Sequence, residues 1–217
     1  MKNARRETEM GTKVPVISFK SGRAVPLPPV EAGGPLEQCL RSRRSTRNFK
    51  DEAVSLAQVT QLLWAGQGVT GLGGLRAVPS AGAMYPLRTY LVAAHVEGLV
   101  AGVYQYNPDG HTLEQRSAGD KRQALSVAMM GQECITECTG AILFTAWFNR
   151  VAREFGEHAA RLVHIEAGHA GQNICLQATA LGLGVIGLGR YDPDALRTAL
   201  SIPSKEEPVY LIAFGRK

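Results

Sequence analysis

The sequence predicts an α+β fold, in which strand hairpins and helices share one core. Residues 102–106 and 111–116 flank the turn formers Asn107-Pro108-Asp109-Gly110, a pattern typical of an antiparallel hairpin. From about Glu157 to Leu181, apolar and small residues recur at helical spacing. That stretch predicts one long helix with close neighbours on several sides.

The other elements follow from local periodicity and turn residues. Ser55 is suited to cap a helix that starts at Leu56, and the glycines of residues 66–86 predict a loop. We further expect helices over residues 35–44, 120–131 and 193–200, and strands over residues 89–96, 141–148, 182–190 and 209–214.

Residues 1–34 differ from the rest of the chain because they are polar and rich in proline. We expect an extended N-terminal arm there, which could wrap a partner subunit, and one domain over residues 35–217. The 217-residue length and the 45% hydrophobic content suit a globular domain with a sizeable core.

Composition narrows the possible partners. The net charge is +5, but aromatic residues are only 6% and do not alternate with the basic ones, which argues against nucleic-acid binding. No apolar run approaches the roughly 20 residues of a membrane span. The four cysteines form no C-x-x-C pair and favour a reducing, cytoplasmic compartment.

The first candidate site is the run Arg43-Arg44-Ser45-Thr46-Arg47. Guanidinium and hydroxyl groups at this density suit a phosphate group. A solvated basic surface is the alternative interpretation.

The second candidate is the loop Pro79-Ser80-Ala81-Gly82-Ala83-Met84-Tyr85-Pro86. Two prolines around small residues fix a tight turn whose backbone can approach a flat ring or a phosphate. An ordinary surface loop is equally compatible with this pattern.

The third candidate is Gly182-Leu183-Gly184-Val185-Ile186-Gly187, which matches G-x-G-x-x-G. A dinucleotide-binding turn requires a strand before the glycines and a helix after them, and here the order is reversed. The glycines instead end the long helix and allow the backbone of Gly187, Leu188 and Gly189 to lie against a ligand.

His164, Glu166 and His169 suggest a metal site, but two histidines five residues apart diverge by about 140° on a helix. We therefore expect no metal site and assign them structural or interface roles. No G-x-S-x-G motif or activated cysteine supports nucleophilic catalysis.

Taken together, these motifs resemble those of the nitroreductase family, and specifically of its SagB-type dehydrogenase branch. The similar patterns are R-R-S-x-R at Arg43–Arg47, P-S-A-G-x-x-Y-P at Pro79–Pro86, and E-A-G-H-x-x-Q-N at Glu166–Asn173, which runs into Ala180–Gly184. The resemblance covers residues 36–215 in the family's order.

The resemblance implies a nitroreductase-like fold, with a central mixed or antiparallel sheet flanked by helices. It also implies an intertwined homodimer with two FMN sites at the interface and NADH or NADPH as a possible electron donor. The implied FMN-binding residues are Arg43, Arg44, Ser45, Arg47, Ser80, Ala81, Gly82, Tyr85, Gly187, Leu188, Gly189 and Arg216.

Three positions depart from the family pattern. Ala83 replaces an asparagine, Gly189 replaces a glutamate, and Glu154-Phe155-Gly156 replaces the Lys-Tyr-Gly of azoline-oxidising members. The expected function is ping-pong hydride transfer through FMN to a small organic acceptor. The alternatives are an azoline dehydrogenase of peptide maturation, which the third departure weakens, and a non-catalytic flavin-binding module.

Overall fold

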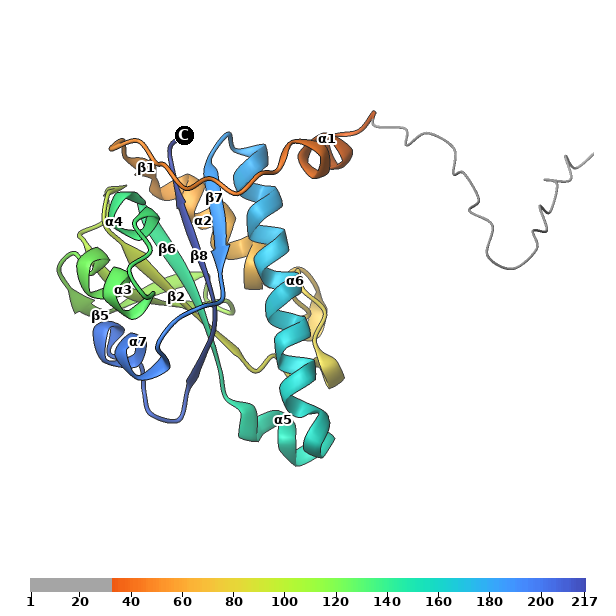
Figure 1. Ribbon diagram of the computed structural model, residues 1–217. Helices are drawn as coiled ribbons and strands as arrows, with labels where there is room; N and C mark the ends of the chain where they lie inside the picture. The colour runs from red at the N-terminus through yellow and green to blue at the C-terminus, as the bar shows by residue number, and fades with distance from the viewer. Residues whose placement is uncertain (1–32) are drawn as a thin grey trace, which may run out of the picture. The chain divides into compact units, whose positions relative to one another are not determined.

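A six-stranded antiparallel sheet forms the centre of the domain in the computed structural model, which describes residues 33–217 (Figure 1). Its strand order is β5-β4-β2-β6-β8-β7. The strands are β2 (Leu87–Ala93), β4 (Gly102–Asn107), β5 (Thr112–Ala118), β6 (Gly140–Ala146), β7 (Gly184–Leu188) and β8 (Glu207–Gly215). A separate parallel pair joins β1 (Val54–Ser55) to β3 (Val96–Glu97).

Helices cover both faces of this sheet (Figure 1). α2 and α6 pack on one face, and α3, α4 and α7 pack on the other. The helices are α1 (Pro35–Ser42), α2 (Leu56–Gln67), α3 (Arg122–Ala128), α4 (Cys134–Glu137), α5 (Phe148–Phe155), α6 (Ala159–Ala180) and α7 (Pro193–Leu200). The predicted α+β class is therefore confirmed, and the sheet is antiparallel throughout.

The alternation of strand side chains explains the two layers. On β6, Leu143 faces the α3–α7 layer, whereas Phe144 faces α6. Since both faces are covered, the central strands β2 and β6 are buried along their whole length except at Arg88. At the predicted helix start, Ser55 and Gln58 form a capping box that fixes the beginning of α2.

Several predicted boundaries are wrong, and one helix is unpredicted. The expected strand 141–148 ends at Ala146, and the expected helix 35–44 ends at Ser42. The expected strand 89–96 ends at Ala93, and the expected helix 120–131 ends at Ala128. The long helix begins at Ala159 because Gly156, with φ +52°, separates it from α5. The sequence does not predict α5, because Val151 is its one fully buried residue. A single buried residue gives little apolar periodicity.

The predicted arm, residues 1–34, lies outside the described residues except for Gly33 and Gly34. Within residues 33–217, no helix has both the length and the apolar character that crossing a bilayer requires.

Candidate functional site

The basic segment Arg43–Arg47 runs alongside the edge strand β7. Thr46 N donates to the Val185 carbonyl at 2.9 Å, and Ser45 pairs with Val185 in a short parallel bridge. Three residues further on, Lys50 N donates to the Arg216 carbonyl at 3.0 Å. The segment is therefore fixed beside both β7 and the carboxyl end of β8.

Arg43 is directed toward the α6 layer. Burial raises the pKa of the Cys175 thiol on α6 and of the Tyr210 phenol on β8, and the nearby positive charge of Arg43 offsets part of both rises. Within residues 33–217, Arg43 has no carboxylate within 4.0 Å. Its charge is therefore available to an anion.

The two other arginines of the segment have different surroundings. The Arg44 guanidinium donates to the carbonyls of Arg41 at 3.0 Å and Arg43 at 2.8 Å, so local backbone occupies it. Arg47 lies toward α4, where it opposes the rise that burial produces in the pKa of Cys134. It lines a cavity of about 370 Å³ there. The cations thus diverge to two sides of one backbone segment.

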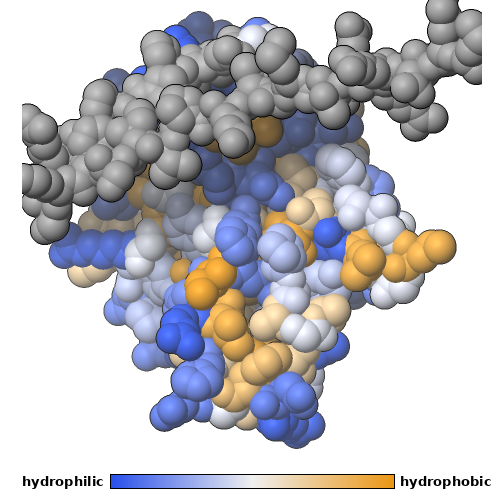
Figure 2. All heavy atoms as spheres, turned by 90° about the vertical axis from the view of Figure 1, so that its right-hand side faces the viewer, coloured by the Kyte–Doolittle hydropathy of each residue, from blue (hydrophilic) through white to orange (hydrophobic). Residues whose placement is uncertain are grey.

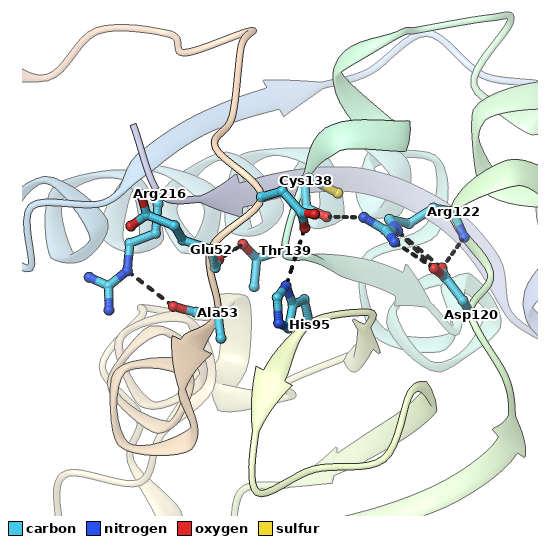
Figure 3. A network of polar contacts seen from close by, with 9 residues as sticks. Glu52, Ala53, His95, Asp120, Arg122, Cys138, Thr139 and Arg216 are labelled. Atoms are coloured by element: carbon cyan, nitrogen blue, oxygen red, sulfur yellow. Dashed lines mark hydrogen bonds and ion pairs between the residues drawn. The ribbon is translucent and has the colours of Figure 1, made fainter.

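Arg216 is held in a network of polar contacts at the carboxyl end of β8 (Figure 3). Its Nε donates to the Ala53 carbonyl at 3.1 Å. Thr139 joins the same region, because its hydroxyl donates to the Glu52 carbonyl at 3.2 Å and its carbonyl accepts from His95 N at 3.0 Å. These contacts hold Arg216 close to the basic segment.

The glycine edge of β7 has two different environments. A Cβ at Gly187 would overlap the ring of Tyr210, whereas a Cβ at Gly189 would meet no atom within 4 Å. Gly187 and Leu188 are half-buried, and Gly189 is exposed. The backbone at Gly189 is consequently uncovered by side chains, as contact with a flat ligand would require, whereas Tyr210 packs on Gly187.

The loop from Ser80 to Tyr85 is tightly folded on itself. Tyr85 N donates to Ser80 Oγ at 2.9 Å, and the Tyr85 hydroxyl accepts from Arg76 N at 3.2 Å. The Arg76 guanidinium also lies 4.6 Å from the centre of the Tyr85 ring. Positive φ values at Gly82, Ala83 and Tyr85 show that these contacts hold a strained turn.

A buried carboxyl group, Glu166 of α6, lies next to this loop. Its side chain is 3% exposed, and burial raises its pKa to about 7, with Ser80, Arg76 and Gln67 offsetting part of the rise. Arg76 Nη1 donates to Gln67 Oε1 at 2.8 Å. Glu166 Oε1, Gln67 Nε2 and Arg76 Nε make no hydrogen bond of normal geometry within the described residues.

The sequence analysis placed Glu166 in a histidine pattern and in the family motif Glu166–Asn173 without assigning it to the site, and it missed Gln67 and Arg76. The available signal was a charged residue on the apolar stripe of a helix, where burial demands a partner. His164 and His169 are both exposed, and His164 Nδ1 contacts the Ala160 carbonyl at 2.6 Å.

The predicted site residues fall into two groups within one chain. Arg43–Arg47, Gly187–Gly189 and Arg216 lie together near the carboxyl-terminal half of α6. The loop Ser80–Tyr85 lies beside Glu166, nine residues before Cys175 on the same helix. That separation corresponds to about 14 Å along the helix axis. One chain alone therefore does not bring the two groups together.

The antiparallel sheet between two helical layers, with the basic segment along its glycine edge, defines the class as an α+β domain with an anion-binding edge. The chain belongs to the nitroreductase family, because the sequence pattern of that family matches residues 40–216. The family resemblance inferred from the motifs is confirmed.

Similar proteins support this assignment. A nitroreductase-type protein of Methanocaldococcus jannaschii is 36% identical over 182 residues, which cover 84% of this chain and 91% of that protein. The trifolitoxin-processing protein TfxB of Rhizobium leguminosarum is 29% identical over 122 residues, 50% of this chain and 30% of TfxB. A nitroreductase-type crystal structure from Anabaena variabilis has a TM-score of 0.75 and 30% identity. It matches 83% of this chain, which spans 38% of the Anabaena chain.

Proposed function

We propose that this protein is an FMN-dependent oxidoreductase that passes hydride from NADH, NADPH or another donor to a small organic acceptor. The observation that carries the proposal is the basic segment fixed along the glycine edge of β7, next to Arg216. The family assignment supports the same conclusion.

The residues present fit a phosphorylated flavin. Arg43 has an unpaired charge among the described residues, and the exposed Ser45 hydroxyl lies on the same segment. We assign the phosphate and ribityl chain to Arg43, Ser45, Arg47 and Arg216. Arg44 is a weaker candidate for contact with the phosphate, because its guanidinium already donates to backbone carbonyls.

The flavin ring is assigned to the backbone of Gly187, Leu188 and Gly189. N–H groups at an uncovered strand edge can donate to the ring and favour its reduced form. FMN, when bound, supplies the hydride chemistry, while these residues orient it and exclude water from one side. No side-chain acid or base is required for this role.

A homodimer would complete the site. The side of the molecule that carries α1 and α6 exposes apolar side chains among polar ones (Figure 2). The exposed apolar residues of α1, α2 and α6 are Leu36, Leu40, Trp64 and Ile165. A second copy on this face could bring its Ser80, Ala81, Gly82 and Tyr85 to the flavin, which one chain alone does not do.

Two other functions remain as alternatives. Similarity to TfxB favours an azoline dehydrogenase of peptide maturation. Against it, Glu154 and Phe155 of α5 provide neither the lysine nor the phenol that would remove a proton there. A non-catalytic flavin-binding module would use the same Arg43–Arg47 segment.

The decisive experiment is an absorbance spectrum of the purified full chain, before and after addition of FMN, followed by anaerobic NADH and NADPH. We expect flavin absorbance that is bleached by at least one nicotinamide. A protein that stays colourless after FMN addition contradicts the proposal. Bound FMN that no donor reduces would favour the binding-module alternative.

A further inference from the structure

A second polar cavity, of about 440 Å³, lies on the sheet face that α7 covers. Arg88 and Tyr90 of β2 line it together with Arg116 of β5, and the loop after α7 closes it with Lys205 and Glu206. The nitroreductase-type site lies instead along β7 and the carboxyl end of β8. Glu206 directly precedes β8, so the length of that nine-residue strand, about 30 Å, separates the cavity from Arg216.

The floor of the cavity is a buried carboxylate whose hydrogen bonds come from hydroxyl groups. Glu206 is 5% exposed, and its Oε2 accepts from Tyr90 at 2.9 Å and from Thr145 at 2.7 Å. Burial and the charge of Glu206 raise the pKa of Tyr90, so the phenol keeps its proton and remains a donor. Within residues 33–217, no cation lies within 4.0 Å of Glu206.

The rim of the cavity is basic. Arg88 is the one exposed residue of the otherwise buried strand β2. Neither Arg88 nor Lys205 has a carboxylate within 4.0 Å among the described residues, and Lys205 Nζ lies 5.1 Å from the centre of the Trp147 ring. Arg116 forms a half-exposed ion pair with Glu114 at 3.2 Å. Such surface pairs are weak and can exchange for a better anion.

We propose that this cavity is a separate binding site for a small phosphate-bearing molecule. Converging Arg and Lys side chains are the groups that recognise phosphate in proteins. The volume exceeds that of a bare ion, since a water occupies about 30 Å³ of liquid. The half-buried Trp147 ring offers a surface on which a small organic body can pack. Free phosphate and a phosphate monoester are the two possible sources of this chemistry.

The test uses Trp147 as the reporter. The chain has two tryptophans, so Trp64→Phe leaves Trp147 as the one emitter. An anion that draws Lys205 from the indole ring should shift its emission. The full chain, saturated with FMN, is titrated with inorganic phosphate, glycerol 3-phosphate or glycerol at constant ionic strength. We expect saturation with glycerol 3-phosphate, weaker or equal binding of phosphate, and no response to glycerol.

Matched variants locate the binding. Arg88→Gln and Lys205→Gln should each weaken glycerol 3-phosphate binding at least tenfold, and the exposed Arg161→Gln on α6 should leave it unchanged. The Arg43→Gln variant, titrated without added FMN, should bind glycerol 3-phosphate as the parent does. This result does not depend on whether the flavin proposal holds. A response that does not saturate, or that survives both rim substitutions, overturns the proposal.

Discussion

Gly187 of β7 lies so close to Tyr210 of β8 that a Cβ at position 187 would overlap the phenol oxygen and ring. Gly171 of α6 approaches the same ring, and a Cβ there would overlap it as well. Tyr210 therefore fills a slot between two glycines. This packing brings α6 against β7 and β8, and it fixes the strand edge that the proposed flavin would contact.

Gly187→Ala should destabilise the domain and displace the edge of β7. Inserting a methyl group into a packed site costs about 1–3 kcal/mol of unfolding free energy. The measurements are urea unfolding and FMN affinity by fluorescence quenching. We expect the unfolding free energy and the FMN affinity to fall together.

Gly189→Ala is the matched control, because a Cβ there meets open space. Its unfolding free energy should stay within about 0.5 kcal/mol of the parent value. If FMN affinity falls in Gly189→Ala while stability does not, the backbone at position 189 contacts the flavin. Equal destabilisation by both substitutions would contradict the packing argument.

Arg43→Gln should weaken FMN binding by roughly 10- to 150-fold, because a hydrogen bond to a charged group contributes about 1.5–3 kcal/mol. Arg44→Gln should change it by less than about threefold, because its guanidinium donates to the carbonyls of Arg41 and Arg43. Equilibrium dialysis against FMN measures both. A larger loss in Arg44→Gln would reverse our assignment within this segment.

Ile165→Asp should convert the proposed homodimer into a monomer with reduced FMN affinity. Ile165 is 48% exposed on α6, and a carboxylate at an apolar interface is costly to bury. Light scattering after size exclusion measures the mass. Val127→Asp, on the opposite helical layer at 75% exposure, is the control and should leave the mass unchanged. A monomeric parent protein would exclude the dimer.

Glu166 should make stability fall as pH rises. Its pKa is about 7 in the folded protein against 4.5 for the ordinary group, so the folded state binds more protons between these values. Stability is then lost from about pH 4.5 to pH 7, by an amount of order 3 kcal/mol.

Glu166→Gln should remove this pH dependence. At pH 8 the variant should unfold at a higher urea concentration than the parent. Glu157→Gln, an exposed carboxylate in the turn before α6, should retain the parental pH dependence. Urea unfolding at pH 5, 6, 7 and 8 provides the comparison. A parent protein whose stability rises over this range would refute the buried, protonated state.

The sequence alone determined the features that depend on near neighbours in the chain. The hairpin at Asn107–Gly110, the cap at Ser55 and the long helix followed from turn chemistry, capping and periodicity. The motifs also sufficed to identify the family. α5 and the end of α3 did not follow, because their boundaries depend on packing and on positive φ values at Gly156 and Met130.

Only the tertiary structure decided how distant residues combine. It placed Arg43 near Tyr210 but turned Arg47 toward α4, although the two arginines are only four positions apart in the sequence. It also brought Arg76 into a hydrogen bond with Gln67, next to Glu166. In the same way it placed Glu206 where its carboxylate accepts from Tyr90. Side-chain direction and burial arise from strand pairing and layer packing across long stretches of chain. Local periodicity carries no information about either.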